Sequence, residues 1–307
     1  MNIQNLNCLI DLHLHLDGSL PLHTVKELAE QQGITLQMTD GELKKKLSVP
    51  AGCRDLNEYL TKFEFPLTLM QTPEALEKCM HDLLTELEGQ GVQYCEVRFA
   101  PQLHTQKMSQ NEVIEAVKAG LYSVAGVKPE SIHAGIILCC MRGSDNGQQN
   151  KITVEEAARH LGSGVCAVDL AGAEALYPTE QYADLFAYAK QLRIPVTIHA
   201  GEAAGTESIR AAVAMGAARI GHGIRAAYDA ETMELLKEHH ITLELCPTSN
   251  LNTKVVDSIG QYPIRQLMDA GVAVTINTDN MTVSDTCIQH EYQLLADTFA
   301  FGDTQIK

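Results

Sequence analysis

Two histidines that stand two residues apart are the first residues of chemical interest. They belong to segment 13–18, His-Leu-His-Leu-Asp-Gly, which ends an apolar run typical of a β-strand. Side chains at i and i+2 of a strand point to the same side, so both imidazoles would face one way, as metal chelation requires. The spacing is also common in ordinary loops, so alone it leaves a metal site and a plain pair of histidines open.

Three later segments carry further side chains that bind metals or transfer protons. Segments 199–202 (His-Ala-Gly-Glu), 221–223 (Gly-His-Gly) and 277–280 (Asn-Thr-Asp-Asn) each follow a strand-like run. The carboxyl ends of parallel barrel strands meet at one rim. That rim would gather His13, His15, His199, Glu202, His222 and Asp279. Imidazole and carboxylate groups suit Zn²⁺, so the pattern predicts a mononuclear catalytic metal centre with an open water position.

A dinucleotide-binding pattern competes for one of these segments. Residues 221–226 fit the relaxed pattern G-x-G-x-x-A, and Glu244 follows at about the distance of the acidic residue in that fingerprint. The fingerprint belongs to a first βαβ unit, whereas this match lies at the sixth strand-like run. A metal site also explains the glycines, since small neighbours let a ligand approach closely. A second competitor is the zinc deaminase class, whose signature, H-x-E with P-C-x-x-C, is absent from the chain.

The end of the fourth strand-like run bears on the number of metal ions. Many two-metal barrel hydrolases carry a carboxylated lysine there, which bridges the two ions. Segment 168–172 reads Val-Asp-Leu-Ala-Gly and contains no lysine. One metal ion per chain is therefore expected.

The chain alternates between strand-like and helical patterns. Short apolar runs without strict alternation are typical of parallel strands covered on both faces. They lie near 8–14, 92–99, 132–140, 165–170, 195–200, 218–222, 241–246 and 272–277. Helical periodicity occupies 112–125, 153–161, 179–192, 206–215, 230–240 and 261–270. This succession predicts an α/β protein with a (β/α)8 TIM barrel, and an open doubly wound sheet is the alternative.

The first crossover is much longer than the others. Helical patterns near 21–33, 39–47, 55–70 and 73–89 predict a helical lid insertion over residues 20–90, between the first and second strands at the barrel mouth. One apolar helix face in it consists of Leu56, Tyr59, Leu60 and Phe63. This face fits either core packing or a lid over a pocket. Because no linker or low-complexity segment marks a boundary, residues 1–307 are expected to form a single domain.

Composition restricts the partners and the location. Of 307 residues, 39 are acidic and 23 are Lys or Arg, for a net charge of −16, whereas nucleic-acid binding needs a basic face. No run approaches the roughly 20 apolar residues of a membrane span. Nine scattered cysteines indicate reduced thiols, and the first residues lack a signal-peptide pattern. A cytoplasmic protein without nucleic-acid or membrane partners is expected, and its oligomeric state is left open.

Taken together, the motifs resemble the adenosine deaminase family of metal-dependent barrel hydrolases. The matching segments run in order over nearly the whole chain. They are 13–19 (His-Leu-His-Leu-Asp-Gly-Ser), 94–101 (Tyr-Cys-Glu-Val-Arg-Phe-Ala-Pro), 169–172 (Asp-Leu-Ala-Gly), 199–205 (His-Ala-Gly-Glu-Ala-Ala-Gly), 219–223 (Arg-Ile-Gly-His-Gly), 246–250 (Cys-Pro-Thr-Ser-Asn) and 277–279 (Asn-Thr-Asp). The combination of segments 199–202 and 277–279 is highly specific.

The resemblance implies a metal centre and a set of catalytic residues. One Zn²⁺ per chain would be held by His13, His15, His199 and Asp279. Glu202 would donate a proton to purine N1. His222 would orient and deprotonate the attacking water, and Asp279 would belong to the catalytic set as well.

The resemblance also implies the contacts to the substrate. Asp17 would hold the ribose 5′-hydroxyl and the Gly172 N–H would donate to purine N3, in a pocket that His15 and Asn280 also line. The helix face described above would be the family's apolar gate, formed by Leu56, Tyr59, Leu60 and Phe63.

Two features depart from the family pattern. Asn280 stands where the family usually has a second aspartate, which contacts purine N7. Since N7 is an acceptor, an aspartate must donate through a shared proton, whereas an Asn amide donates without titrating. The chain also ends at Lys307, soon after the eighth helix that a (β/α)8 barrel implies, whereas the family usually continues with another C-terminal helix.

The reaction implied by the resemblance is hydrolytic deamination of adenosine and 2′-deoxyadenosine to inosine and 2′-deoxyinosine plus ammonia, as in purine salvage. Deamination of adenine or another 6-aminopurine is the nearest alternative. Asp17 favours the nucleoside, because adenine-specific relatives tend to carry Glu there. An inactive barrel that only binds purine nucleosides is an alternative of another class, against which Glu202 and His222 argue.

Overall fold

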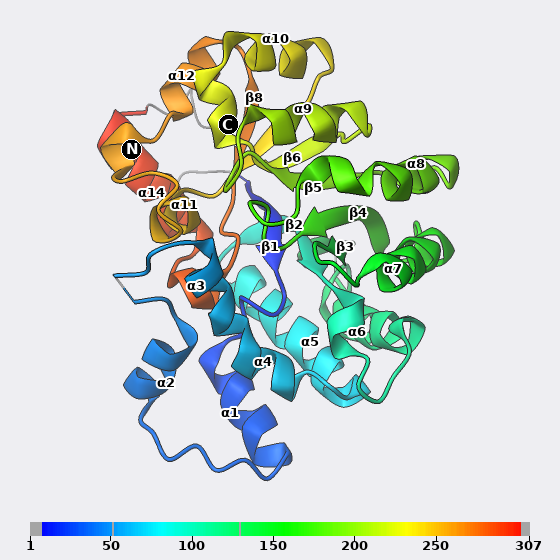
Figure 1. Ribbon diagram of the computed structural model, residues 1–307. Helices are drawn as coiled ribbons and strands as arrows, with labels where there is room; N and C mark the ends of the chain where they lie inside the picture. The colour runs from blue at the N-terminus through cyan, green and yellow to red at the C-terminus, as the bar shows by residue number, and fades with distance from the viewer. Residues whose placement is uncertain (1–7, 51, 129, 302–307) are drawn as a thin grey trace.

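Eight parallel strands form the centre of the computed structural model, which describes residues 8–50, 52–128 and 130–301 (Figure 1). They are β1 Leu9–His15, β2 Val92–Phe99, β3 His133–Met141, β4 Val165–Ala171, β5 Thr197–Ala200, β6 Arg219–His222, β7 Thr242–Leu245 and β8 Ala273–Ile276. All eight predicted strands are confirmed, and most of their apolar residues are buried because helices cover the outer face. The first residues and Lys307, which the expectations about a signal peptide and the chain end concern, lie outside the described residues.

The strands pair in sequence order, in two sheets. One sheet has the order β1-β2-β3-β4 and the other β5-β6-β7-β8. Isolated bridges join the sheets at Val168–Val196 and at Leu14–Asp279. Sequential order is that of a barrel, since a doubly wound sheet reverses its order at a switch point. The predicted (β/α)8 succession is therefore confirmed, although the backbone ladder is interrupted at these two seams.

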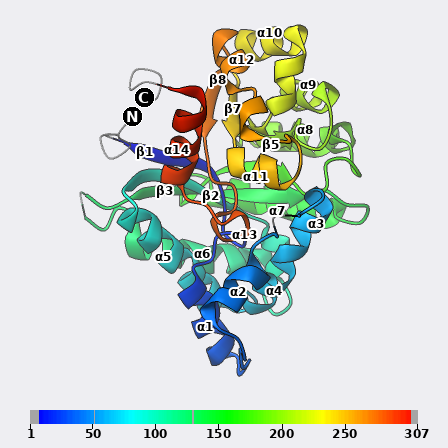
Figure 2. The ribbon, with the colours of Figure 1, turned by 90° about the vertical axis from the view of Figure 1, so that its left-hand side faces the viewer.

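Helices follow the strands and lie on the outside of the sheets (Figure 2). The larger ones are α6 Gln110–Val124, α7 Gly147–His160, α8 Ala183–Gln191, α9 Thr206–Ala214, α10 Ala230–Glu238, α12 Ile264–Asp269 and α14 Ile288–Phe299. Short helices occupy the loops: η3 Pro101–His104, η4 Thr179–Tyr182, η5 Ile224–Tyr228, α11 Pro247–Asn252, η6 Ile259–Gln261 and α13 Met281–Ser284. The predicted helix 153–161 begins earlier, at Gly147. The predicted helix 261–270 begins later, directly after Pro263, which lacks the N–H of a helix interior.

The predicted helical insertion lies between β1 and β2. It consists of α1 Leu22–Gln31, α2 Asp40–Leu47, α3 Leu56–Leu60, η2 Thr61–Phe63, α4 Glu64–Leu69 and α5 Pro73–Gly89. Helix α5 packs against β2 and α6, as an outer barrel helix does, while α1 packs against α2, α4 and α5. The part of the insertion that reaches the barrel mouth is therefore α3 to α4, supported from below by α1 and α2 (Figure 1).

The helix predicted over residues 55–70 is broken into α3, η2 and α4. Pro66 explains the break, because it has no N–H for the carbonyl of Lys62 and its ring would clash with that carbonyl. The backbone keeps right-handed helical dihedrals at the junctions Leu60 and Phe63, so the three pieces follow one another without a loop between them.

Two expectations from composition can be compared with the structure. All nine cysteines are free, as predicted for reduced thiols, and six of them are buried. Among the described residues, no helix combines the length and the apolar character that crossing a membrane requires.

Candidate metal centre and active site

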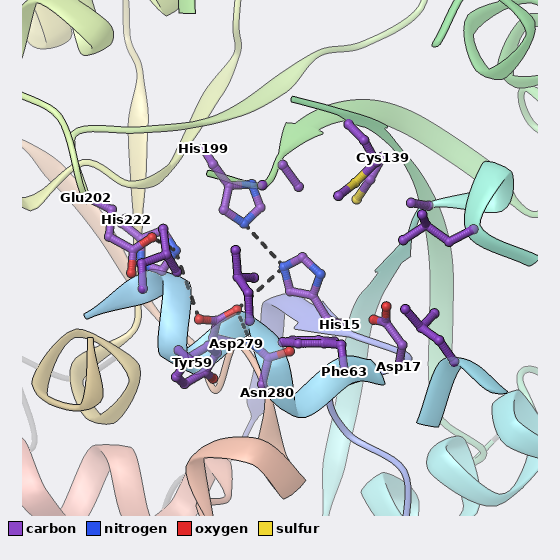
Figure 3. Close-up of a pocket in the computed structure, with 18 residues that line it drawn as sticks. His15, Asp17, Tyr59, Phe63, Cys139, His199, Glu202, His222, Asp279 and Asn280 are labelled. Atoms are coloured by element: carbon purple, nitrogen blue, oxygen red, sulfur yellow. Dashed lines mark hydrogen bonds and ion pairs between the residues drawn. The ribbon is translucent and has the colours of Figure 1, made fainter. Parts of the chain in front are cut away.

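Four predicted metal ligands converge at the carboxyl ends of the strands. His13, His15, His199 and Asp279 each offer a ligand atom, and these atoms lie within 4.8 Å of one another. His15 Nε2 is 3.2 Å from His199 Nε2 and 3.5 Å from Asp279 Oδ1 (Figure 3). His13 Nε2 is 3.6 Å from the same oxygen. The bridge between Leu14 and Asp279 closes the seam that brings β1 and the end of β8 together.

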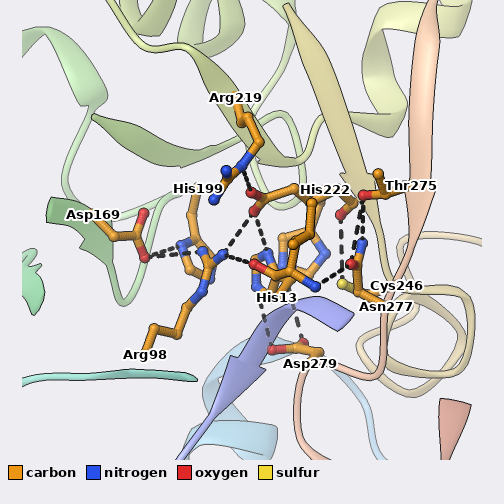
Figure 4. A network of polar contacts seen from close by, with 12 residues as sticks. His13, Arg98, Asp169, His199, Arg219, His222, Cys246, Thr275, Asn277 and Asp279 are labelled. Atoms are coloured by element: carbon orange, nitrogen blue, oxygen red, sulfur yellow. Dashed lines mark hydrogen bonds and ion pairs between the residues drawn. The ribbon is translucent and has the colours of Figure 1, made fainter. Parts of the chain in front are cut away.

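The outer ring nitrogens of two of these histidines face carboxylates. His13 Nδ1 lies 2.9 Å from Glu244 Oε2, and His199 Nδ1 lies 2.8 Å from Asp169 Oδ2 (Figure 4). A carboxylate at Nδ1 holds the proton on that nitrogen and leaves the lone pair on Nε2, the arrangement of metal-ligating histidines.

The same geometry tests whether a metal ion fits. The inward Nε2 of His13 is buried without a hydrogen-bond partner among the described residues, and the Nε2 atoms of His15 and His199 face each other. Nitrogen and carboxylate oxygen atoms gathered in this way suit a cation between them. Burial holds the pKa values of His15 and His199 below the ordinary range, so both rings are neutral and able to bind a metal. Three imidazoles and one carboxylate form a possible metal-binding group of the composition that zinc favours.

Arg98 on β2 joins the two carboxylates beneath the histidines. Its Nη2 donates to Glu244 Oε2 at 2.8 Å and its Nη1 to Asp169 Oδ2 at 3.3 Å, and all three side chains are fully buried (Figure 4). Burial alone would raise the pKa of each carboxyl. The positive charge of Arg98 and the histidine contacts outweigh it, so both pKa values lie below the usual range. Both carboxylates therefore stay ionised beneath the metal group.

Arg219 on β6 holds this network from the side away from the cavity. Its Nε donates to Glu244 Oε1, and its Nη2 contacts Glu96 on β2. The side chain of Arg219 is a quarter exposed, at 25%, whereas that of Arg98 has no exposed surface. Both guanidinium groups thus bind Glu244, but only that of Arg98 is fully buried.

Glu202 lies in the loop after β5 with its carboxyl group buried. Thr253 Oγ1 donates to its Oε1 at 3.2 Å, and His222 Nε2 lies 3.6 Å from its Oε2. Burial, followed by the negative charges of Asp279 and Glu174, raises the pKa of Glu202 to about 8. The carboxyl group is therefore protonated at neutral pH and can act as a general acid.

His222 ends β6 between this carboxyl and the metal group. Its Nε2 is 3.6 Å from Glu202 Oε2 and 4.0 Å from Asp279 Oδ2. Tyr262 Oη donates to Asn250 Oδ1 at 3.0 Å, which leaves the Asn250 amide nitrogen to donate to His222 Nδ1 at 3.0 Å. Burial keeps the pKa of His222 well below its usual range, so the ring is neutral and carries its proton on Nε2. In this tautomer Nε2 donates a hydrogen bond toward the site.

Backbone geometry around these residues explains the glycines of segment 221–223. A Cβ atom on Gly221 would lie 2.8 Å from His13 Cε1, so only glycine lets β6 pass this close to the histidine. His222 and Asp279 have φ values of 60° and 63°, a conformation that costs energy for residues other than glycine. The metal group therefore accounts for Gly221, whereas Gly223 is required by its φ of +68° and by Leu243, which lies 2.6 Å from where a Cβ atom would stand.

A cavity of about 230 Å³ opens in front of the metal group (Figure 3). His15, His199, Glu202, His222 and Asp279 line one side of it, together with Asp17, Gly172 and Asn280. Gly172 directly follows β4 and has a φ of +107°, which strains any other residue. The cavity thus joins the metal group to every residue for which the sequence predicts a substrate contact.

Asp17 and Asn280 each keep an unpaired oxygen beside this cavity. The Asp17 Oδ1 atom is buried without a hydrogen-bond partner among the described residues, and burial raises the pKa of Asp17 to about 6. The Asn280 Nδ2 donates to Asp279 Oδ1 at 2.7 Å, and its Oδ1 has no such partner. Because the Asp279 carboxylate only accepts hydrogen bonds, the nitrogen of the Asn280 amide, and not its oxygen, faces Asp279.

The lid face covers the other side of the cavity. Leu56, Tyr59, Leu60 and Phe63 all line it. Tyr59 is buried against Val283 on α13, and its hydroxyl forms a 2.7 Å hydrogen bond with Ser284. Core packing therefore describes Tyr59, which anchors this face to α13. The other three side chains are partly exposed around the cavity, as a lid over a pocket would be.

The sequence profile of adenosine deaminase matches residues 8–307. An adenosine deaminase of Haemophilus ducreyi is 48% identical over 304 residues, which cover 97% of this chain and 88% of that protein. The chain belongs to the adenosine deaminase family.

Solved structures agree with this assignment to the adenosine deaminase family at the level of the fold. The N6-methyl-AMP deaminase of Arabidopsis thaliana aligns with a TM-score of 0.83 at 26% identity, over 99% of this chain and 89% of that one. The adenine deaminase of Arthrobacter aurescens aligns with a TM-score of 0.85 at 23% identity, over 96% of this chain and 88% of that one. Both similarities support the TIM-barrel fold predicted from the sequence.

In this member of the adenosine deaminase family, several site residues had no role assigned from sequence. Arg98, Asp169 and Glu244 are charged residues inside otherwise apolar strands, and that conflict is the signal that could have drawn attention to them. Glu174 gives no such signal, because it lies in a loop and a loop carboxylate is ordinarily solvated. Only the tertiary structure shows that Glu174 is buried.

Proposed function

We propose that the chain catalyses hydrolytic deamination of adenosine and 2′-deoxyadenosine to inosine and 2′-deoxyinosine, with release of ammonia. The observation that carries this proposal is the buried carboxyl of Glu202, which lines the same cavity as the metal group. Family membership and the Haemophilus ducreyi relative named adenosine deaminase support the substrate.

One Zn²⁺ per chain is the metal that best fits the site. Its ligands are His13, His15, His199 and Asp279, and the carboxylates of Asp169 and Glu244 hold the correct tautomers of two of them. When bound, zinc supplies a water molecule whose pKa is lowered to about 7, which provides a nucleophile at neutral pH.

Glu202 makes carbon C6 of the purine reactive. An aromatic C6 is a poor electrophile, and protonation of the adjacent N1 concentrates positive charge beside it. The carboxyl group can donate this proton only if it is protonated when the substrate binds, and a pKa of about 8 meets that condition. Attack by water then gives a tetrahedral adduct, from which ammonia leaves.

His222 orients the attacking water beside Glu202 and Asp279. Donation by Asn250 to Nδ1 places the proton of His222 on Nε2, which suits orientation of the water through a hydrogen bond. Deprotonation of the water by His222, the second task implied by the resemblance, requires the lone pair on Nε2. That tautomer would require the Asn250 amide to turn over, so that its oxygen faces Nδ1 and its nitrogen faces the Tyr262 hydroxyl.

The cavity fits a nucleoside better than a nucleotide. None of its lining residues is Lys or Arg, so the described residues offer no cation for a 5′-phosphate. Asp17 instead presents an unpaired carboxyl oxygen, which accepts a hydrogen bond from a 5′-hydroxyl and repels a phosphate. The Gly172 N–H donates to N3, His15 lies beside the reacting centre, and Asn280 meets N7 with the amide hydrogen that Asp279 does not use.

The remaining features of the proposal concern the chain as a whole. Residues 1–307 form one catalytic domain, in which Leu56, Tyr59, Leu60 and Phe63 gate the cavity. The enzyme works in the cytoplasm on small purine nucleosides, without nucleic-acid or membrane partners. The acidic net charge of −16 and the free cysteines support this.

A substrate panel on zinc-loaded protein tests the proposal. Ammonia release is measured with adenosine, 2′-deoxyadenosine, adenine and AMP, before and after removal of the metal by a chelator. We expect turnover of the two nucleosides only, and only with metal. Preferred turnover of adenine would favour the base-deaminating alternative. Binding of adenosine without ammonia release by fully loaded protein would favour the inactive barrel.

A further inference from the structure

Glu174, in the loop after β4, has a buried carboxylate, and the loop after β5 wraps around it. Four consecutive backbone N–H groups donate to it: Gly201 to Oε1 at 2.7 Å, and Glu202, Ala203 and Ala204 to Oε2 at 3.1, 2.7 and 3.0 Å. The hydroxyl of Ser208 at the start of α9 donates to Oε1 as well. The side chain of Glu174 thus replaces the solvent that a loop backbone of this kind would otherwise need.

This arrangement needs a charged acceptor. Four neighbouring N–H groups turned toward one point form a concave site for an anion. Gly201, with a φ of +70°, makes the turn possible, and a Cβ atom there would lie 2.5 Å from Ile209. All of these donors to Glu174 are neutral, so they stabilise its negative charge without cancelling it.

We propose that Glu174 is a positioning residue for Glu202: its carboxylate fixes the loop that carries the proton donor and sets a negative charge behind it. The inference rests on the proposed role of Glu202. Rigid support matters because a general acid must stay within hydrogen-bond reach of the atom that it protonates.

The charge of Glu174 has a second consequence for Glu202. It is one of the causes that raise the pKa of Glu202, after burial and the charge of Asp279. Other charged or titratable groups that face Glu202 or this loop are His13 on β1, His222 on β6, Tyr262 before α12 and Arg142 after β3. Arg142 donates to Thr179, which contacts Ser208, and to the carbonyl of His199, and its positive charge also interacts with Glu174. Without the charge of Glu174, the protonated state of Glu202 should persist over a narrower pH range.

Two substitutions separate the charge from the hydrogen bonds. Glu174→Gln keeps the shape but removes the charge and turns an amide N–H₂ against N–H donors. Ser208→Ala, the matched control, removes one donor to the same carboxylate and leaves the charge in place. For both, the measurements are zinc content, kcat/KM against pH, amide hydrogen exchange at residues 201–204, and the pKa of Glu202 from its carboxyl ¹³C shift.

In Glu174→Gln we expect zinc content unchanged, kcat lowered at least tenfold and faster exchange at residues 201–204. The pKa of Glu202 and the alkaline limb of kcat/KM should both fall by about half to one pH unit, because a negative charge that opposed ionisation has gone. Ser208→Ala should keep the limb of the parent protein. If Glu174 served folding alone, Glu174→Gln would lower activity without moving the alkaline limb of the kcat/KM profile.

An unchanged pKa of Glu202 in Glu174→Gln, or kcat within twofold of the parent, would overturn the proposal. If Glu174→Gln does not fold, Glu174→Asp decides: it keeps the charge but falls short of the N–H groups, so kcat should drop while the limb stays. Full activity of Glu174→Asp would also overturn the proposal. The exchange and ¹³C readouts need no turnover, so a parent that does not deaminate adenosine would refute the proposed function and leave the positioning role measurable.

Discussion

The charged network beneath the metal group and the lid face above the cavity bound the same site in opposite ways. The network consists of Arg98, Asp169 and Glu244, all fully buried and joined by directional contacts of 2.8 to 3.3 Å. The lid face is apolar and, apart from Tyr59, partly exposed.

The two boundaries should therefore respond differently to substitution. A buried charge that loses its partner costs several kcal/mol, so the network has little tolerance. Apolar contact has no direction and scales with area, so substitutions in the lid face should cause graded losses. Substitutions in the network should change metal binding, and substitutions in the lid should change substrate binding alone.

The largest effect is expected where the network meets the metal. His199→Ala removes a ligand and leaves Asp169 without its histidine contact, so both the metal and turnover should be lost. Metal analysis of the purified variant, alongside ammonia release from adenosine, checks this. Two ions per parent chain, or full activity of the parent after exhaustive chelation, would contradict the predicted metal centre.

Glu202→Gln should fold and bind zinc, because Glu202 belongs to neither boundary, but it cannot deliver a proton. We expect kcat to fall by about 10²–10⁴-fold, the usual contribution of general acid catalysis. In the parent the protonated carboxyl is the active form, so kcat/KM should decline as pH rises through about 8. A variant within a few-fold of the parent would assign the acid role to another residue.

Arg98→Lys tests the network without removing its charge. A lysine ammonium cannot hold both carboxylates at the geometry of a guanidinium, so zinc affinity should fall by roughly 10–100-fold. Competition with a chromophoric chelator measures the affinity. Arg219→Lys is the control, since Arg219 binds the same Glu244 from a partly exposed position. Equal losses of zinc affinity in both variants would show that the buried guanidinium of Arg98 has no special role in metal binding.

Leu60→Ala tests the lid face. It removes part of the apolar surface over the cavity, so KM for adenosine should rise by about fivefold while kcat stays within about twofold. Zinc affinity should match that of the parent protein. A change in zinc affinity as large as that of Arg98→Lys would end the distinction between the two boundaries.

Asn280→Asp should have the smallest effect at neutral pH, and the structure adds a reason to the sequence argument. The new carboxyl would stand against Asp279 Oδ1, which now accepts a 2.7 Å hydrogen bond from Asn280. Two carboxylates at this distance share a proton, so the variant should remain an adenosine deaminase but lose kcat/KM more steeply above neutral pH. The measurement is kcat/KM against pH for the parent and the variant, with adenosine and with its 7-deaza analogue. Superimposed adenosine profiles would show that Asn280 does not meet N7.

The sequence alone determined the strand order and the identity of the candidate ligands. Parallel strands present their carboxyl ends at one rim, so functional residues that follow strand-like runs are expected to lie together at that rim. His13, His199 and Asp279 were predicted together for that reason, and the structure brings them together. The lid face was also found, since helical spacing shows which side chains share a face.

Only the tertiary structure decided which charged groups meet across the barrel. Spacing along the chain reports direction and burial, but the contact of Arg98 with Asp169 and Glu244 depends on how three strands are staggered. The same holds for Glu174, whose partners lie 27 to 30 residues away along the backbone of another loop. The orientation of the Asn280 amide depends on a neighbour's charge. Such pairings follow from three-dimensional distance, which a one-dimensional pattern does not encode.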